Sequence, residues 1–247
     1  MGKWKLEVSY DGSNFAGYQI QPNKRTVQEE IEKVLTRMHK GEYTKVIASG
    51  RTDARVHAVG QVIHFTSQLN ISEFAWKKAL NSQLPDDIFA VKCEKVEEDF
   101  HARYGAKEKE YRYVLYTGED FPPFYRNYKM HVPYKLNVEA MKEALHFLEG
   151  THDFSSFCAA NTSVVDKVRT IFEAELLVEE NEVIIRLKGN GFLYNMVRII
   201  VGTLIEIGLE KKKSVDMKTI IEAKNRAVAG KTAPPEGLYL WRVDYNN

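Results

Sequence analysis

Polar and hydrophobic residues alternate at the start of the chain, which predicts a β-strand. The alternating run covers residues 4–10, and the turn residues Asp11 and Gly12 follow it. Apolar side chains then recur every three or four positions over residues 27–38, which predicts a helix with one apolar face. Thr26 and Glu29 have the spacing of a capping box, so we expect this helix to begin with a side-chain cap at Thr26.

The pattern continues with more strands and a second helix. Apolar runs at residues 45–48 and 61–66 predict two strands, separated by a polar loop over residues 49–60. Ser72 is expected to cap a helix, and residues 88–96 form the next predicted strand. The predicted order is therefore strand, helix, strand, strand, helix, strand.

The second part of the chain repeats this order. Its predicted elements are a strand at 110–117, a helix after Asn137, strands at 171–178 and 182–188, a helix at 194–209 and a strand at 238–243. An insertion with several prolines covers residues 117–135, and an extra helix is expected over residues 214–229. We therefore expect an α+β protein of two ferredoxin-like βαββαβ halves, residues 1–104 and 105–247, with their sheets joined side by side and a cleft between them.

Length and composition indicate a globular protein. The chain has 247 residues, 44% of them hydrophobic and 28% charged, enough to bury a core in one large domain or two small ones. Its longest uncharged apolar run, residues 199–205, is much shorter than the ~20 residues of a membrane-spanning helix. Because the first residues also lack a signal-peptide pattern, we expect a cytoplasmic protein that does not enter a membrane.

Cysteine and histidine spacing does not indicate a metal centre. Cys93 and Cys158 are far apart, which fits two buried thiols in a reducing compartment. His57 and His64 lack a third ligand at metal spacing, so we expect hydrogen-bonding or structural roles for them and no metal site.

The net charge does not by itself indicate a nucleic-acid binder. It is +1, from 35 basic and 34 acidic residues. The distribution is uneven, since residues 186–198 contain three basic residues and no acid, whereas acids gather at 94–99 and 173–182. A balanced total is therefore compatible with one basic face.

The most unusual stretch is the loop of residues 50–58, with the sequence Gly-Arg-Thr-Asp-Ala-Arg-Val-His-Ala. As an ordinary turn residue, Asp53 would cap its own loop, and Arg51 and Arg55 would be solvated. As a functional group, a carboxylate beside two arginines stays ionised, which suits a nucleophile or an electrostatic partner better than a proton donor. The residues alone leave both interpretations open.

Motifs along almost the whole chain occur together, in this order, in one known family. The matching segments are residues 10–12, 17–21, 50–62, 99–103, 111–113, 152–154, 196–202 and 236–240. With these motifs the chain resembles the TruA family of tRNA pseudouridine synthases. The resemblance implies an isomerase that converts uridine to pseudouridine in the tRNA anticodon arm, at positions 38 to 40, without a cofactor. It also implies a homodimer with each tRNA lying across both subunits.

The resemblance implies roles for individual residues. Asp53 matches the catalytic aspartate, and Tyr111 matches the tyrosine that packs on the uracil, whereas Tyr113 is expected in the core. Arg51 matches an arginine that holds the flipped nucleotide. Arg198 lies where the family has a basic partner for the carboxylate, and its apolar neighbours favour a paired cation. The cations expected along the RNA path are Arg103, Lys107, Lys109, Arg112, Arg126, Lys129, Arg186 and Lys188.

Two positions depart from the family pattern and leave other functions open. Arg55 stands where the family usually has glycine, and Tyr18 stands where it usually has tryptophan. If position 55 needs a positive φ, the arginine is strained; if not, it adds a cation beside Asp53. The alternatives are a catalytically impaired tRNA-binding protein or chaperone of the same fold, and a hydrolytic N-glycosidase that releases free uracil.

Overall fold

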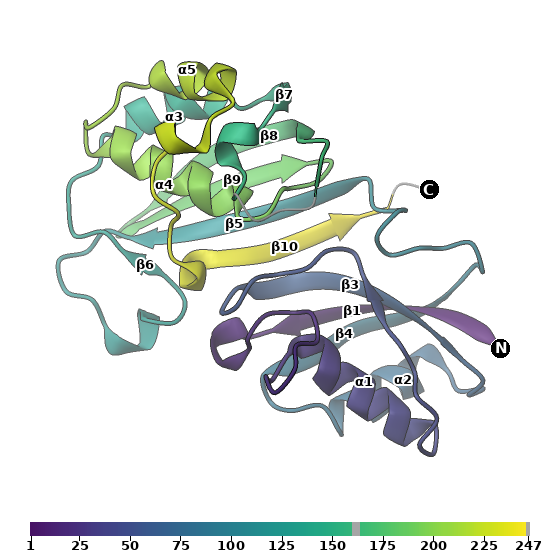
Figure 1. Ribbon diagram of the computed structural model, residues 1–247. Helices are drawn as coiled ribbons and strands as arrows, with labels where there is room; N and C mark the ends of the chain where they lie inside the picture. Colours follow the sequence, from purple (N-terminus) through teal and green to yellow (C-terminus); the bar gives the residue numbers. More distant parts are fainter. Residues whose placement is uncertain (160–163, 246–247) are drawn as a thin grey trace. The chain divides into compact units, whose positions relative to one another are not determined.

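The computed structural model describes residues 1–159 and 164–245 (Figure 1). It shows the mixed α+β fold that the sequence predicts, in two compact units. Unit 1 comprises Met1–Lys107 and Tyr239–Asn247, and unit 2 comprises Glu108–Leu238. No helix within the described residues is long and apolar enough to cross a membrane.

Unit 1 is built on a sheet with the strand order β4-β1-β3-β10, and β2 also pairs with β3. Its elements are β1 (Gly2–Tyr10), α1 (Val27–Met38), β2 (Ile47–Ala48), β3 (His57–Ser67), α2 (Glu73–Asn81), β4 (Ile88–Val96) and β10 (Leu238–Asp244). The predicted order of the first six elements is confirmed. The central strand β1 is antiparallel to both neighbours, so that Leu6 pairs with Ile63 and with Cys93.

The last strand belongs to unit 1 and pairs there with β3. Tyr239 pairs in parallel with His57, and Leu240 pairs with Ala58. The sequence pattern placed this strand in the second half, at residues 105–247. Strand pairing over a long separation in sequence leaves no local signal, which is why the pattern could not indicate it.

The core of unit 1 lies between the sheet and its two helices, which Figure 1 shows on one side of the strands. Ile31 and Leu35 of α1 and Leu80 of α2 are fully buried. Trp76 of α2 is also fully buried, and its ring lies 5.5 Å from that of Trp4. The apolar faces predicted from helical spacing are therefore the faces that form the core.

The two helix caps predicted in this unit have different outcomes. Ser72 caps α2 by accepting a hydrogen bond from the Ala75 N–H at 3.2 Å, as predicted. Thr26 precedes α1 in an extended conformation, but its side chain makes no capping hydrogen bond, so the predicted capping box is wrong. Thr26 is fully buried, and its hydroxyl has no hydrogen-bond partner among residues 1–159 and 164–245.

Unit 2 has the strand order β5-β9-β8-β7, with β6 pairing in parallel with β5. Its elements are β5 (Glu108–Tyr116), β6 (Met130–His131), α3 (Val138–His146), β7 (Gly150–Asp153), β8 (Val168–Glu179), β9 (Glu182–Gly189), α4 (Met196–Gly208) and α5 (Asp216–Ala223). Short 3-10 helices lie at Gly12–Asn14 in unit 1 and at Pro123–Tyr125, Ser155–Phe157, Arg226–Val228 and Pro235–Gly237 in unit 2.

The longer predicted elements of unit 2 are confirmed, and the shorter ones differ. The strands β6 and β7 were not predicted, because they have only 2 and 4 residues, too few to show an alternating pattern. The predicted helix over residues 214–229 is shorter, since α5 ends at Ala223 and Lys224 takes a left-handed conformation with φ 49°. α4 is buried along nearly its whole length, with Arg198 as its only charged residue before Glu206.

The buried His64 makes the stability of unit 1 depend on pH. Its Nδ1 accepts a hydrogen bond from the Ala102 N–H at 3.0 Å. Burial, with the charges of His101 and Lys3, lowers the pKa of His64 to about 4. Because the unfolded chain then takes up a proton that the native state does not, we expect the free energy of unfolding to fall as the pH drops from about 6.5 to about 4.

Urea unfolding at several pH values checks this expectation. His64→Asn keeps an acceptor in the position of Nδ1 but does not titrate, so its stability should decline less than that of the wild type between pH 6.5 and pH 4. Parallel pH profiles for the two proteins would show that His64 does not contribute.

Candidate active site

The loop of Asp53 runs between β2 and β3 in unit 1. Asp53 is half-buried, whereas Arg51 and Arg55 are exposed. The Val56 N–H donates a hydrogen bond to the Asp53 carbonyl at 3.1 Å, which closes a tight turn. Arg55 is the third residue of this turn and has φ 65°. Position 55 therefore does require a positive φ, which decides the question that the sequence left open.

Two glycines allow the segment after β1 to pack on the backbone of this loop. A Cβ on Gly12 would lie 2.1 Å from the Val56 carbonyl oxygen. Gly17 has φ 116°, and a Cβ there would lie 3.1 Å from the Thr52 carbonyl oxygen and 3.3 Å from the Ala54 nitrogen. Only glycine permits this approach, so the residues around Asp53 are held by backbone contacts on two sides.

Two backbone hydrogen bonds join the same segments. The Tyr18 N–H donates to the Thr52 carbonyl at 3.0 Å, and the Arg55 N–H donates to the Phe15 carbonyl at 3.2 Å. The Tyr18 ring is buried, and its hydroxyl finds no hydrogen-bond partner among the residues that the structure describes. Tyr18, which stands where the family usually has tryptophan, thus makes a backbone contact with the loop.

A buried polar network supports the loop on its inner side. The Tyr10 hydroxyl lies 2.7 Å from Thr52 Oγ1. The Gln61 side chain accepts a hydrogen bond from Ser49 Oγ at 2.7 Å and donates one to the Gly50 carbonyl at 2.9 Å. Burial raises the pKa of Tyr10 to about 12, so this phenol stays protonated at neutral pH.

Removing the Tyr10 hydroxyl tests how much this network contributes. Tyr10→Phe leaves the buried Thr52 hydroxyl without its partner, so we expect the free energy of unfolding to fall by about 1–3 kcal/mol. Tyr104→Phe is the matched control, because its ring is 77% exposed. Urea unfolding measures both, and equal stability of the two variants would contradict a supporting role for Tyr10.

His57 closes the end of the loop, in the hydrogen-bonding role predicted for it. Its buried ring accepts a hydrogen bond at Nδ1 from the Gly12 N–H at 3.0 Å and stacks on Tyr239 at 4.8 Å. Asp11 Oδ1 lies 3.3 Å from the same nitrogen and also accepts from the Ser13 N–H, so Asp11 makes its turn as expected.

Tyr111 lies on β5 in unit 2. It is half-buried, and its ring meets Phe192 edge to face, with centroids 5.0 Å apart. Tyr113 is fully buried and donates from its hydroxyl to the Pro234 carbonyl at 2.8 Å. The two tyrosines thus differ in burial: Tyr113 lies in the core, as expected, and Tyr111 is partly exposed.

Arg198 is held in place by groups of unit 2. Its Nε donates to the Ala233 carbonyl at 2.7 Å, and its Nη1 donates to Asn195 Oδ1 at 2.9 Å. The Ala233 N–H donates back to the Arg198 carbonyl at 3.0 Å. The half-buried guanidinium is therefore fixed in one orientation, which fits the prediction that a cation in this apolar helix has partners.

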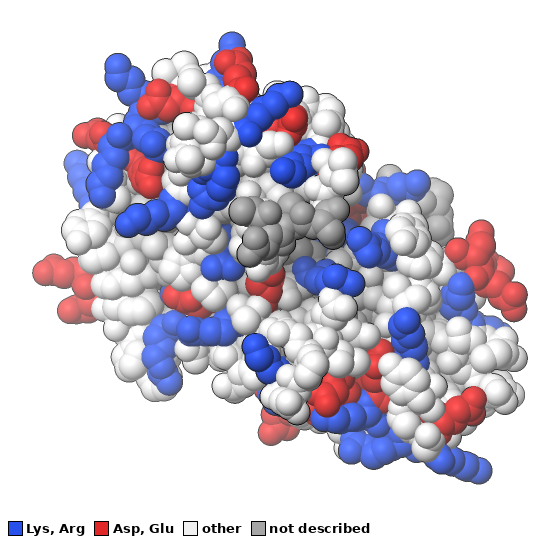
Figure 2. Space-filling view, viewed as in Figure 1, with Lys and Arg blue, Asp and Glu red and all other residues white. Residues whose placement is uncertain are grey.

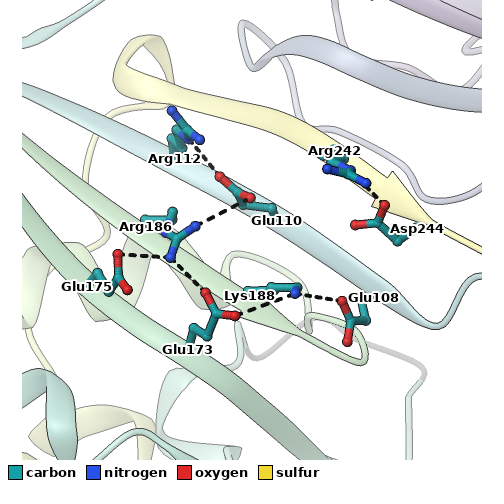
Figure 3. A network of polar contacts seen from close by, with 9 residues as sticks. All are labelled: Glu108, Glu110, Arg112, Glu173, Glu175, Arg186, Lys188, Arg242 and Asp244. Carbon is teal, nitrogen blue, oxygen red and sulfur yellow. Dashed lines mark hydrogen bonds and ion pairs between the residues drawn. The ribbon is translucent and has the colours of Figure 1, made fainter.

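Three of the cations expected along an RNA path, Arg112, Arg186 and Lys188, form ion pairs with acids of the same sheet (Figure 3). Their contacts are Arg112 with Glu110 at 2.7 Å, Arg186 with Glu173 at 2.7 Å and Glu175 at 2.8 Å, and Lys188 with Glu108 at 2.8 Å. These pairs lie along and across β5, β8 and β9, a register that the sequence does not give. These pairs balance charge on the sheet, and the expectation that the three cations lie along the RNA path stays a prediction.

Charge on the visible surface is mixed. Figure 2 shows lysine and arginine side chains interspersed with aspartate and glutamate, in keeping with the net charge of +1. Lys129 also pairs with Glu182 and lies over the Tyr125 ring at 3.8 Å. Among the residues described, no cluster of three or more histidine, cysteine or acidic side chains is arranged to hold a metal ion.

Comparison with known proteins identifies the family. A family model described as tRNA pseudouridine synthase matches residues 7–105 and 144–246. The chain is 58% identical to the tRNA pseudouridine synthase A of Anoxybacillus flavithermus, over 100% of both chains. The chain belongs to the tRNA pseudouridine synthase family. The resemblance found in the sequence motifs is therefore confirmed, and the synthase is an isomerase.

Other relatives agree with this assignment. The synthase is 54% identical to the tRNA pseudouridine synthase A 1 of Bacillus cereus strain ATCC 14579, again over 100% of both chains. A solved structure of a Cbf5-Nop10-Gar1 complex matches 96% of this chain and 58% of its own chain, at 14% identity and a TM-score of 0.35.

Proposed function

We propose that this synthase converts uridine to pseudouridine at positions 38, 39 and 40 of the tRNA anticodon arm, with Asp53 as its catalytic carboxylate. The observation that carries the assignment of Asp53 is the loop around it. Backbone contacts from Gly12 and Gly17 and the buried Tyr10 hydroxyl fix this loop, which keeps the half-buried carboxylate in one place. A catalytic group needs such fixed geometry, and an ordinary surface turn does not.

The reaction defines what the carboxylate has to do. The bond from N1 of uracil to C1′ of ribose breaks, C5 bonds to C1′ in its place, the hydrogen on C5 leaves as a proton, and N1 gains one. No net oxidation or hydrolysis occurs, so the overall change needs no cofactor. The ribose passes through an electron-poor or unsaturated state, where an ionised carboxylate acts either by adding to C1′ or by removing a proton from C2′.

Three further residues complete the proposed site. Flipping the uridine out of its stack costs a few kcal/mol, and stacking of the uracil on Tyr111 offsets part of that cost. The exposed Arg51 holds the RNA around the flipped nucleotide, through its planar guanidinium. Arg198, oriented by Ala233 and Asn195, is the basic partner of the carboxylate.

The proposed site lies in a cleft between two ferredoxin-like halves whose sheets join side by side. The strand order β4-β1-β3 with β2 on β3 in unit 1, and the order β5-β9-β8 in unit 2, support a ferredoxin-like strand arrangement within each half. We also propose that two copies form a homodimer, which supplies more surface for tRNA than one copy of charge +1. The buried thiols of Cys93 and Cys158 fit a reducing cytoplasm.

Mapping of pseudouridine in treated tRNA tests the proposal. The purified protein is incubated with unmodified tRNA, and pseudouridine is located by carbodiimide modification and primer extension. We expect new stops at positions 38 to 40 in tRNAs that have uridine there. Binding without product would favour a catalytically impaired RNA-binding protein, and release of free uracil would favour an N-glycosidase; either result would overturn the proposal.

A further inference from the structure

The side chain of Arg55 has no role in the fold that the structure reveals. It is exposed, and none of the described residues forms a hydrogen bond, ion pair or ring contact with its guanidinium. The paired Arg25 in the same unit differs, since it makes two hydrogen bonds to Asp87 at 2.6 and 2.8 Å. Arg55 therefore resembles a group that is kept ready for an external partner.

The backbone at Arg55 is unfavourable for an arginine. Its φ of 65° lies in the left-handed region, where glycine and asparagine are tolerated better than residues with long side chains. The conformation is imposed by the loop, because the Arg55 N–H bonds to Phe15 and the next residue, Val56, packs on Gly12. Any residue at this position has to adopt this left-handed conformation. The arginine backbone is therefore strained, and its side chain makes no contact with the described residues that would offset the strain.

The position of Arg55 next to Asp53 limits which chemical group its side chain can bind. Arg55 is two residues after Asp53, at the exposed end of the same turn, and the exposed Arg51 is two residues before it. A ribose that meets the Asp53 carboxylate carries a phosphate on each side, within the length of an arginine side chain. Guanidinium groups bind phosphate through paired, charge-assisted hydrogen bonds.

We infer that Arg55 binds a phosphate next to the target uridine and is a second RNA-binding arginine of this loop, in addition to Arg51. This inference rests on the proposed function, because it places the RNA against Asp53. The contact fixes the position of the RNA backbone and does not read the base.

Substitution by asparagine separates strain from binding. Arg55→Asn suits the left-handed conformation and removes the charge, so the midpoint of thermal unfolding should stay at the wild-type value or rise by up to about 4 °C. The same variant should bind unmodified tRNA about tenfold more weakly. The slope of log affinity against log salt should fall in magnitude by about 0.7–0.9, as expected for one lost phosphate contact.

Two further variants act as controls. Arg55→Lys keeps a charge and should stay within about threefold of the wild-type affinity. Lys40→Asn removes another exposed cation of unit 1, at a residue with φ 57°, and should change neither the affinity nor the salt slope. Wild-type affinity and slope for Arg55→Asn, or equal losses for Lys40→Asn, would overturn the inference.

A chemically altered RNA locates the contact. An anticodon stem-loop with one neutral methylphosphonate linkage, placed on either side of the target uridine, is titrated against the wild type and Arg55→Asn. When the neutral linkage replaces the phosphate that Arg55 contacts, the wild type and Arg55→Asn should bind the stem-loop with equal affinity. Additive losses at both linkages would overturn the assignment. Failure of the wild type to form pseudouridine, measured in a separate product assay, would instead refute the proposed function.

Discussion

Asp53→Asn should lower the rate of pseudouridine formation by about 10⁴-fold and leave the affinity for tRNA within about threefold of the wild type. The amide has the shape of the carboxylate but can neither add to C1′ nor remove a proton from C2′, so the reacting ribose loses its only partner in the proposed chemistry. Asp53 is half-buried within a loop held by other residues, so the substitution should not unfold the protein.

Single-turnover kinetics with a saturating amount of enzyme measures this effect. Asp86→Asn is the matched control, because it makes the same change at an exposed position of unit 1 and should have the wild-type rate. A rate for Asp53→Asn within tenfold of the wild type would show that another group performs the chemistry.

Tyr111→Leu should lower kcat/KM by about 10- to 100-fold, because leucine fills similar space but has no aromatic face on which uracil can stack. Base–aromatic stacking contributes about 1–3 kcal/mol, which corresponds to this range. Tyr111→Phe keeps the ring and its edge-to-face contact with Phe192, so it should stay within about threefold of the wild type.

The comparison of leucine with phenylalanine distinguishes stacking from a role of the hydroxyl. Tyr134→Leu is the control for loss of an aromatic ring at a surface, since Tyr134 is 64% exposed. Equal losses for Tyr111→Phe and Tyr111→Leu would show that the hydroxyl is the essential group, and wild-type kinetics for both would remove Tyr111 from the site.

Periodicity along the sequence was enough to predict the long elements of both units. The core positions Ile31 and Leu35 follow from helical spacing, and the alternation at Leu6 follows from the strand pattern. What depends on distant residues could not be predicted. The parallel pairing of Tyr239 with His57 and the absence of a capping bond at Thr26 both arise from tertiary contacts.

In the candidate site, too, local motifs could be predicted from the sequence and contacts between distant residues could not. Motifs identified Asp53 and its loop, but the sequence did not decide the conformation of Arg55, because φ depends on how the neighbouring segments hold the turn. Nor did it reveal that Tyr10 bonds to Thr52 across the unit. The only available signal was a tyrosine at the end of an otherwise apolar inward-facing row. The pairing of Arg186 with Glu173 and Glu175 needed the strand register.

Release of tritium from C5 of uridine tests most directly whether this protein isomerises uridine in tRNA with Asp53 as its catalytic carboxylate. Forming the bond from C5 to C1′ displaces the hydrogen on C5, so tRNA labelled there with tritium should release it to water, one atom for each pseudouridine formed and with no free uracil. We expect the wild type to do this and Asp53→Asn to fail while still binding the tRNA. Free uracil from the wild type, or tritium release by Asp53→Asn at the wild-type rate, would contradict the assignment.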